Sequence, residues 1–311
     1  MSRSVLLLIL TLTFALVAPP ATAQQLPTIR VVTTQIDSGA QVYYAESIGL
    51  FKKAGINVEI TRAATGAAIA AAVASGAADI GHSNVLSIAT AHDRGIPLVV
   101  IAPGNLFVAR LHQTAMVVGL NSPIQTARDL VGKTIAVNGL KSITEIATDA
   151  WLDQQGVSLA SVKFVDMPFS TMTDAIVHGR VDAAITAEPE FDDGLAKKLY
   201  RVLSYPYEAV QAQFMSTCWF ASTPWVKAHP DLVRAYASVM QQTAVWANKN
   251  QAQTGKVLEQ LTGMAIPPGS GRVFFATELE VKDVQPVIDV AAKYGALRAV
   301  FPAADLILRV N

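Results

Sequence analysis

The chain has 311 residues, in which 24 Lys and Arg balance 24 Asp and Glu. No block of Lys or Arg and no basic-aromatic stripe occurs, so nucleic acid is not an expected partner. The chain has one cysteine, Cys218, so it can form neither an internal disulfide nor a cysteine metal cluster. We interpret Cys218 as a small buried residue. A hydrophobic content of 51% with only 15% charged residues predicts a compact, closely packed α/β body.

Residues 1–23 have the features of a cleavable secretion signal. Arg3 supplies the positive charge, residues 5–17 form an apolar run too short to span a bilayer comfortably, and residues 21–23 (Ala-Thr-Ala) form a small-x-small cleavage site. We expect cleavage before Gln24. No cysteine lies near that position, so we do not expect a lipoprotein, and no later apolar run is long enough to cross a membrane. The expected mature protein is soluble and periplasmic.

The chain after the signal predicts an alternation of strands and helices. The first unit has a β-branched strand, an amphipathic helix, a second strand, an Ala-rich helix and a Gly-Ala-Ala-Asp turn into a third strand, at residues 31–34, 43–53, 55–61, 66–75 and 76–81. A second unit repeats this order at residues 134–137, 142–154, 162–166, 170–178 and 179–186. The same spacing separates Gly76 from Gly179 and Asp79 from Asp182. Two copies of one α/β unit predict two similar lobes with parallel sheets and a ligand cleft between them.

Segments outside the two copies predict how the lobes are joined. Apolar strands at 115–119 and 215–221, just before and just after the second copy, are the candidate crossings between lobes. The helices predicted after residue 221 have no counterpart in the first half, so we assign them to the completion of the first lobe. The expected division is residues 24–115 for the first part of lobe 1, 116–215 for lobe 2 and 216–311 for the rest of lobe 1.

Polar residues that follow the predicted strands are the candidate binding residues. In an open parallel sheet, ligands bind beyond the carboxyl ends of strands and beside helix N-termini, where backbone N–H groups favour an anion. This rule selects Gln35, Ser38, Thr65, Gly66, His82, Ser83, Asn84 and Asn105 in lobe 1, and Asn138, Lys141, Ser142, Phe169 and Glu188 in lobe 2.

Two loops in the second unit predict opposite ligand preferences. The loop 138–142 precedes a helix and carries Lys141, which favours an anion, whereas Glu188 would suit an amine or the N–H edge of a nitrogen heterocycle. Structural alternatives remain open. Ser142, followed three residues later by Glu145, has the pattern of a capping box, and Lys141 is also compatible with a solvated surface charge. Asp79 and Asp182 are assigned to turns rather than to ligand contacts.

Signals for catalysis or cofactors are weak. Residues 81–85 resemble a nucleophile elbow but lack its second Gly, the five histidines show no metal-binding spacing, and there is no dinucleotide or P-loop fingerprint. We therefore expect no cofactor, no metal and no enzymatic activity.

Several motifs resemble one family of solute-binding proteins, which serve nitrate, sulfonate, taurine and thiamine-precursor transport (the NMT1/THI5-like group). They lie at residues 43–60, 74–81, 129–137, 179–184, 187–189 and 229–233, with Val131 in place of the usual Lys. The match runs along the mature chain. The cysteine cluster of the pyrimidine synthases in this superfamily is absent, since Cys218 stands alone.

The resemblance implies a type II periplasmic binding protein fold, with two α/β lobes and a two-strand hinge that closes on a ligand. It implies delivery of the ligand to an ABC permease. It does not fix the ligand, which could be of the sulfonate or taurine, nitrate or pyrimidine-precursor type. We expect the protein to be a monomer and the ligand to be a small polar organic molecule. An exported enzyme, or a sensory binding protein on the same fold, remains the alternative.

Overall fold

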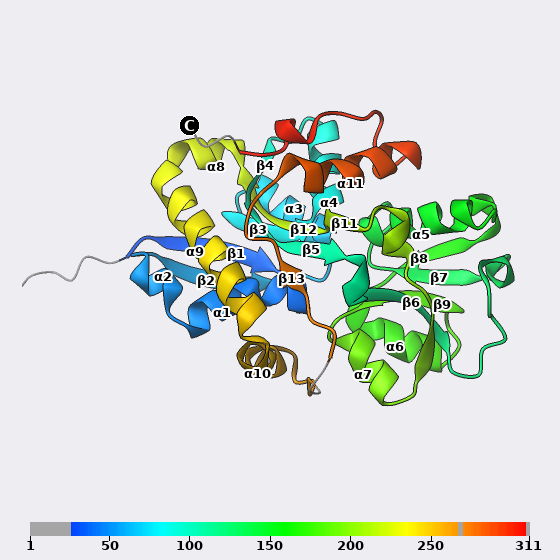
Figure 1. Ribbon diagram of the computed structural model, residues 1–311. Coiled ribbons are helices and arrows are strands. Elements are labelled where there is room, and N and C mark those ends of the chain that lie inside the picture. Colours follow the sequence, from blue (N-terminus) through cyan, green and yellow to red (C-terminus); the bar gives the residue numbers. More distant parts are fainter. Residues whose placement is uncertain (1–25, 267–269, 309–311) are drawn as a thin grey trace, which may run out of the picture.

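The computed structural model describes residues 26–266 and 270–308, so the predicted secretion signal lies outside the described residues. Two five-stranded sheets form the centres of two lobes (Figure 1). The first sheet has the order β2-β1-β3-β12-β4 and the second has the order β10-β6-β9-β7-β8. Their strands are β1 (Thr28–Thr33), β2 (Asn57–Arg62), β3 (Ile80–Asn84), β4 (Leu98–Pro103) and β12 (Thr217–Ser222), then β6 (Thr114–Gly119), β7 (Thr134–Val137), β8 (Lys163–Asp166), β9 (Ala183–Ala187) and β10 (Tyr200–Ser204).

The two sheets have the same topology. In each, three strands in the order 2-1-3 run parallel, and a fourth strand pairs antiparallel with the third strand and with an edge strand. That fourth strand is β12 in lobe 1 and β6 in lobe 2. The internal repeat predicted from the sequence is therefore present as two copies of one sheet.

The aspartates that mark the repeat have the same structural role in both lobes. Asp79 Oδ2 accepts a hydrogen bond from the backbone N–H of Arg30 at 2.8 Å, and Asp182 Oδ2 accepts one from the backbone N–H of Thr134 at 2.8 Å. In return, the backbone N–H of each aspartate donates to the carbonyl of the same partner at 2.9 Å. Each carboxylate thus fixes the start of the first strand against the turn into the third, which confirms the turn assignment of both residues.

A small third sheet joins the lobes. Its strands are β11 (Gln213–Met215), β5 (Asn105–Val108) and β13 (Phe274–Phe275), and both of its pairings are antiparallel. β5 carries the chain from β4 of lobe 1 to β6 of lobe 2, and β11 carries it back from β10 to β12. The strands predicted at 115–119 and 215–221 flank these connections, but the paired segment itself was not predicted.

Helices cover both sheets. They are α1 (Gln41–Ser47), α2 (Leu50–Lys53), α3 (Gly66–Ala74), α4 (Val85–Asp93), α5 (Ile143–Gln154), α6 (Phe169–Val177), α7 (Glu190–Ala196), α8 (Thr223–Ala228), α9 (Pro230–Lys249), α10 (Gln251–Thr262) and α11 (Val281–Lys293). Short 3-10 turns lie at η1 (Asp37–Ala40), η2 (Ala109–Leu111), η3 (Ala127–Leu130), η4 (Leu159–Ser161), η5 (Pro206–Ala209) and η6 (Ala303–Asp305). None of the helices within the described ranges is long and apolar enough to span a membrane.

One helix prediction needs correction. The stretch 43–53 is not one helix, because Gly49 adopts a left-handed conformation (φ 72°) and separates α1 from α2. Ile48, the C-cap residue of α1, is 36% exposed. α11 packs against α4 of lobe 1 and also against α5 of lobe 2 (Figure 1). Lys293 of α11 pairs with Asp153 of α5 at 3.1 Å.

We predict that Asp79→Ala lowers the free energy of unfolding by about 1–3 kcal/mol, because the Arg30 backbone N–H loses its carboxylate partner. Asp182→Ala should lower the free energy of unfolding by less, since the Asp182 side chain is 36% exposed and the Asp79 side chain only 10%. Urea unfolding measures both changes, with Asp231→Ala as a control at a side chain that is 89% exposed. An effect of Asp79→Ala no larger than that of the control would contradict the assignment.

Candidate functional site

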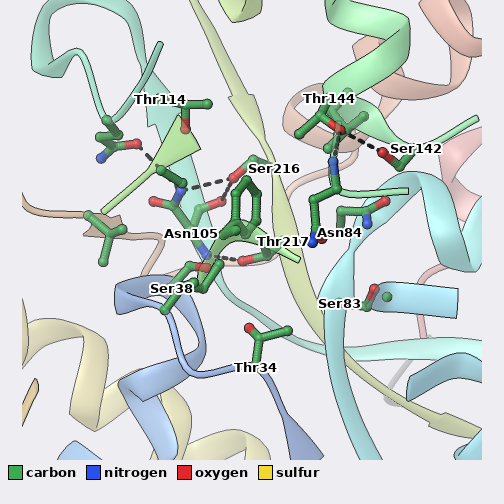
Figure 2. A pocket seen from close by; sticks show the side chains of 18 of the residues that line it. Thr34, Ser38, Ser83, Asn84, Asn105, Thr114, Ser142, Thr144, Ser216 and Thr217 are labelled. Atoms are coloured by element: carbon green, nitrogen blue, oxygen red, sulfur yellow. Dashed lines mark hydrogen bonds between the residues drawn. The ribbon is translucent and has the colours of Figure 1, made fainter. Parts of the chain in front are cut away.

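A cavity of about 70 Å³ lies between the two lobes, and both contribute to its wall (Figure 2). Its lining is mostly short polar side chains with a few apolar ones. Ten of the thirteen predicted residues line it: Ser38, Gly66, His82, Ser83, Asn84, Asn105, Asn138, Ser142, Phe169 and Glu188. The rule that selected them, polar residues beyond strand ends, thus places most of them around one space.

Four helices begin at this cavity. Residues of the first turn or the N-cap of α3, α4, α5 and α6 line it: Gly66, Asn84, Ser142 and Phe169. Their first backbone N–H groups have no partner within their own helix, so this end of each helix favours electron-rich ligand atoms. Two of the helices come from each lobe, which allows a ligand to contact both lobes at once.

Gly66 is required by the close approach of α3 to α4. A Cβ atom at this position would collide with the hydroxyl of Ser83 and would approach the Ser87 hydroxyl and the Asn84 amide within 2.8 Å. The absence of a side chain therefore lets the α3 N-terminus reach the cavity wall.

The start of α5 differs from the predicted capping box. The Ser142 hydroxyl makes no cap bond and instead lies 2.8 Å from the Thr144 hydroxyl, which accepts the backbone N–H of Asn138 at 3.1 Å. The Glu145 carboxylate accepts the N–H of Lys141 rather than that of Ser142. Ser142 is thereby left to face the cavity (Figure 2).

Three predicted residues do not line the cavity. The Lys141 side chain is 57% exposed and its ammonium lies 3.4 Å from Glu145, so its charge is directed away from the cavity. Gln35 donates to the carbonyl of Leu261 and lines a neighbouring surface pocket. Thr65 caps α3 by accepting the N–H of Ala68 at 3.3 Å.

His82 is buried and uncharged. Its Nε2 lies 2.9 Å from the Thr217 hydroxyl, its ring packs on Trp219 with centroids 4.7 Å apart, and Nδ1 has no partner. Burial lowers the pKa of His82 to about 3, so the imidazole is neutral at physiological pH. Trp219 is itself fully buried.

Glu188 is the single carboxylate among the lining residues, and no Lys or Arg is among them. The residue is 3% exposed, its Oε1 has no hydrogen-bond partner, and its Oε2 accepts the N–H of Asp192 at 3.4 Å. Burial, and then the negative charges of Asp192 and Asp37, raise the pKa of Glu188 well above its usual range. The carboxyl group therefore favours a proton or a donor from a ligand.

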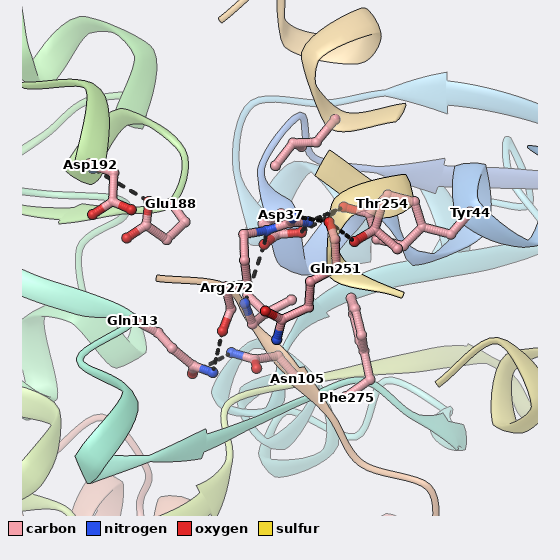
Figure 3. A network of polar contacts seen from close by, with 12 residues as sticks. Asp37, Tyr44, Asn105, Gln113, Glu188, Asp192, Gln251, Thr254, Arg272 and Phe275 are labelled. Carbon is pink, nitrogen blue, oxygen red and sulfur yellow. Dashed lines mark hydrogen bonds and ion pairs between the residues drawn. The ribbon is translucent and has the colours of Figure 1, made fainter. Parts of the chain in front are cut away.

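A buried ion pair beside Glu188 connects several segments (Figure 3). The Arg272 guanidinium donates to both carboxylate oxygens of Asp37, at 2.6 and 2.9 Å, and the two side chains are 7% and 0% exposed. Asp37 also accepts the Tyr44 hydroxyl at 2.6 Å. Across the cleft, the backbone N–H of Asp37 donates to the carbonyl of Glu188 at 3.2 Å. The pair thus holds the loop after β1, the segment before β13 and the Glu188 loop together.

Eleven lining residues were not predicted: Thr34, Ile36, Gln113, Thr114, Ile143, Thr144, Ala187, Tyr207, Ser216, Thr217 and Val273. Those adjacent to predicted positions, such as Thr34 and Thr144, follow the same strand-end rule and could have been found by widening it. Gln113, Ser216 and Val273 come from the joining segments and from the C-terminal part of the chain, where no local pattern marks them. The described residues contain no group of three His, Cys, Asp or Glu side chains placed to hold a metal ion.

The fold and the shared cavity give the chain the two-lobed architecture of periplasmic binding proteins. The NMT1/THI5-like family matches residues 38–254, and the chain belongs to that family. The taurine-binding periplasmic protein of Escherichia coli is 27% identical over 188 residues, which cover 60% of this chain and 56% of that protein. The chain therefore matches little more than half the length of this relative.

Solved structures share the whole architecture. The alkanesulfonate-binding protein SsuA from Xanthomonas axonopodis pv. citri, bound to MOPS, superimposes with a TM-score of 0.76 at 17% identity, covering 93% of this chain and 100% of that one. The aliphatic sulphonate binding protein SsuA of Escherichia coli gives 0.73 at 17% identity, covering 91% and 92%. The nitrate-binding protein NrtA of Synechocystis PCC 6803 gives 0.72 at 13% identity, covering 91% and 85%. At these identities the likeness shows the fold alone.

Arg272→Met should lower the free energy of unfolding by about 3–5 kcal/mol, because it leaves the buried Asp37 carboxylate without its cation. Chemical denaturation provides the measurement. The matched control is Arg298→Met, whose partner is Asp93 and whose side chain is 76% exposed, and for which about 1 kcal/mol or less is expected. Equal effects of the two substitutions would show that the Asp37–Arg272 pair does not hold these segments together.

The His82 imidazole should remain neutral from pH 8 to pH 4, because its pKa in the folded protein is about 3. An unfolded histidine titrates near 6.5, so the unfolded state binds more protons between these values and stability falls as the pH drops below about 6.5. Nitrogen NMR of the ring, with His82→Gln for assignment and a urea-unfolded sample for reference, tests this. A folded-state titration between pH 6 and 7 would disprove the buried, neutral assignment.

Proposed function

We propose that this protein is the exported ligand-binding component of an ABC importer, which captures a small polar organic ligand between its lobes and delivers it to a membrane permease. The observation that carries the proposal is the cavity, whose wall combines helix N-termini and polar side chains from both lobes. Membership of the NMT1/THI5-like family and the likeness to sulfonate- and nitrate-binding structures support it.

The proposed mechanism is closure of the lobes about the segments that join them. A ligand that touches both lobes binds the closed state better than the open state, and so shifts the population toward closure. The structure has contacts between the lobes, including Asn138 Nδ2 to the carbonyl of Ala64 at 3.5 Å and the Asp37–Glu188 backbone bond. We propose the lobe boundaries given by the sequence, 24–115, 116–215 and 216–311, with a cleaved signal at 1–23, no lipid anchor, a periplasmic location and a monomeric state.

The geometry favours binding over hydrolysis. The Nε2 atom of His82 faces Thr217, whereas the neighbouring Ser83 hydroxyl has no hydrogen-bond partner among the described residues. An imidazole with a pKa of about 3 is also a poor general base at neutral pH. An exported enzyme is therefore the weaker proposal, and turnover of an identified ligand would distinguish it. A sensory protein would share the binding site and differ in its membrane partner.

A thermal-shift screen of the mature protein, residues 24–311, tests the proposal. The compounds are nitrate, sulfonates including taurine, and pyrimidines. Because a ligand that binds the folded state raises the melting temperature by mass action, even modest affinity becomes visible at saturation. Failure of every class to bind would contradict the transport proposal for these ligands.

Ser142→Ala and Glu188→Ala should each weaken binding of a ligand found in this way by about tenfold or more, because each removes a polar partner in the cavity wall. We expect the far-UV circular dichroism of both variants to be unchanged, which would show that the fold survives. Lys141→Ala is the matched control, since Lys141 adjoins Ser142 but does not line the cavity. Unchanged affinity in both test variants would remove lobe 2 from the proposed site.

A further inference from the structure

Asn105 presents an unpaired hydrogen-bond acceptor in the cavity wall. The residue begins β5, lines the cavity and is 7% exposed. Its amide nitrogen donates to the Ser216 hydroxyl at 2.9 Å and to Gln113 Oε1 at 3.4 Å, whereas its Oδ1 has no partner (Figure 2). Because an unpaired buried acceptor costs free energy, this oxygen marks a place for a donor.

The orientation of the Asn105 amide is fixed by a chain of hydrogen bonds that has only one direction (Figure 3). It starts at the backbone carbonyl of Arg272, which can only accept, and which receives Gln113 Nε2 at 3.4 Å. This places Gln113 Oε1 toward Asn105, and an oxygen there requires Asn105 to offer its nitrogen. Asn105 Oδ1 is consequently turned away from Gln113 and left without a donor.

Two further contacts hold this orientation. The Ser216 hydroxyl donates to the backbone carbonyl of Asn105 at 3.2 Å, so its oxygen is free to accept the Asn105 amide nitrogen. Arg272, at the start of the chain of bonds, is itself held by the buried ion pair with Asp37. A reversed Asn105 amide would therefore place oxygen against oxygen at Gln113, and could bond Ser216 only if the Ser216 hydroxyl gave up its bond to the Asn105 carbonyl.

The other side of the cavity also offers an unpaired acceptor. Glu188 lines it with Oε1 unpartnered, and no Lys or Arg is among the lining residues. Asp192 and Asp37 are the acidic groups that act on Glu188, and the nearby Arg272 guanidinium is bound to Asp37. The wall therefore has acceptor oxygens for which the described part of the protein supplies no donor.

We propose that the ligand carries an N–H donor, as an amino group or a ring N–H, which binds Asn105 Oδ1, and that Gln113 determines this specificity by fixing the Asn105 amide. The inference rests on the proposed function and narrows its ligand class. A ligand with acceptor oxygens alone, such as nitrate or a plain alkanesulfonate, leaves Asn105 Oδ1 unpaired. Loss of one such buried hydrogen bond reduces affinity by about tenfold or more.

Two pairs of compounds test the donor requirement in the mature protein by calorimetry, with nitrate as a third probe. The pairs are taurine against ethanesulfonate and 4-aminopyrimidine against pyrimidine, and each differs only by an amino group. We expect the amino compound of at least one pair to bind at least tenfold more tightly than its partner. If the taurine pair shows this preference, the ligand is an aminosulfonate; if the pyrimidine pair shows it, the ligand is a nitrogen heterocycle. Binding of nitrate, ethanesulfonate or pyrimidine as tightly as any amino compound would overturn this inference and leave the proposed function standing. No binding by any probe would count against both.

Gln113→Leu tests the specificity role, because it frees the Asn105 amide to turn and offer its nitrogen to the ligand. The preference for the amino compound should fall at least fivefold, through weaker binding of the amino compound, stronger binding of its partner, or both. A merely structural role would weaken both compounds equally and keep their ratio, which would overturn the role of Gln113. The control is Gln242→Leu, which removes an exposed amide that bonds Ser238 on α9.

Discussion

The buried ion pair between Asp37 and Arg272 connects the parts of the molecule that form the cavity. Asp37 lies in the loop that follows β1, and Arg272 lies just before β13 in the joining sheet. Through its backbone N–H, Asp37 reaches Glu188 of the opposite lobe, and through its carbonyl, Arg272 orients Gln113. Removing two charges from water is costly, and the cost is offset here because the Arg272 fork, the Tyr44 hydroxyl and the Val273 N–H all bind the carboxylate. One interaction therefore positions residues on both sides of the cleft.

The repeated sheet explains why the cavity lies where it does. Each lobe directs the carboxyl ends of its parallel strands, and the helix N-termini that follow them, toward the same space between the lobes. The joining segments reach this space: β5 contributes Asn105, and Ser216 lies directly after β11. The residues proposed to bind a ligand and the segments proposed as the hinge are thus neighbours, which suits a protein that closes on its ligand.

The fold could be predicted from the sequence further than the site could. The apolar pattern of the sequence located β7 at its observed bounds, Thr134–Val137, and α5 to within one residue. This was possible because the buried face of each element can be recognised from the order of its own residues. Asp79 and Asp182 were assigned correctly because their turn is repeated in both units. Lys141 was placed in the anion site because it adds a positive charge to the loop before α5, yet its own left-handed conformation (φ 56°) and its pairing with Glu145 direct it outward. Gln113 and Arg272 were beyond prediction, because their partners are distant in sequence and nothing in their local pattern distinguishes them.

Hydrogen exchange with and without ligand tests the central claim most directly, because the claim is that one ligand contacts both lobes in the cleft. The ligand is the compound that gives the largest shift in the thermal screen. The account predicts that it slows amide exchange together at the N-termini of α3 and α4 in lobe 1, of α5 and α6 in lobe 2, and in the joining strands β5 and β11. Protection confined to one lobe, or located away from the cleft, would contradict it.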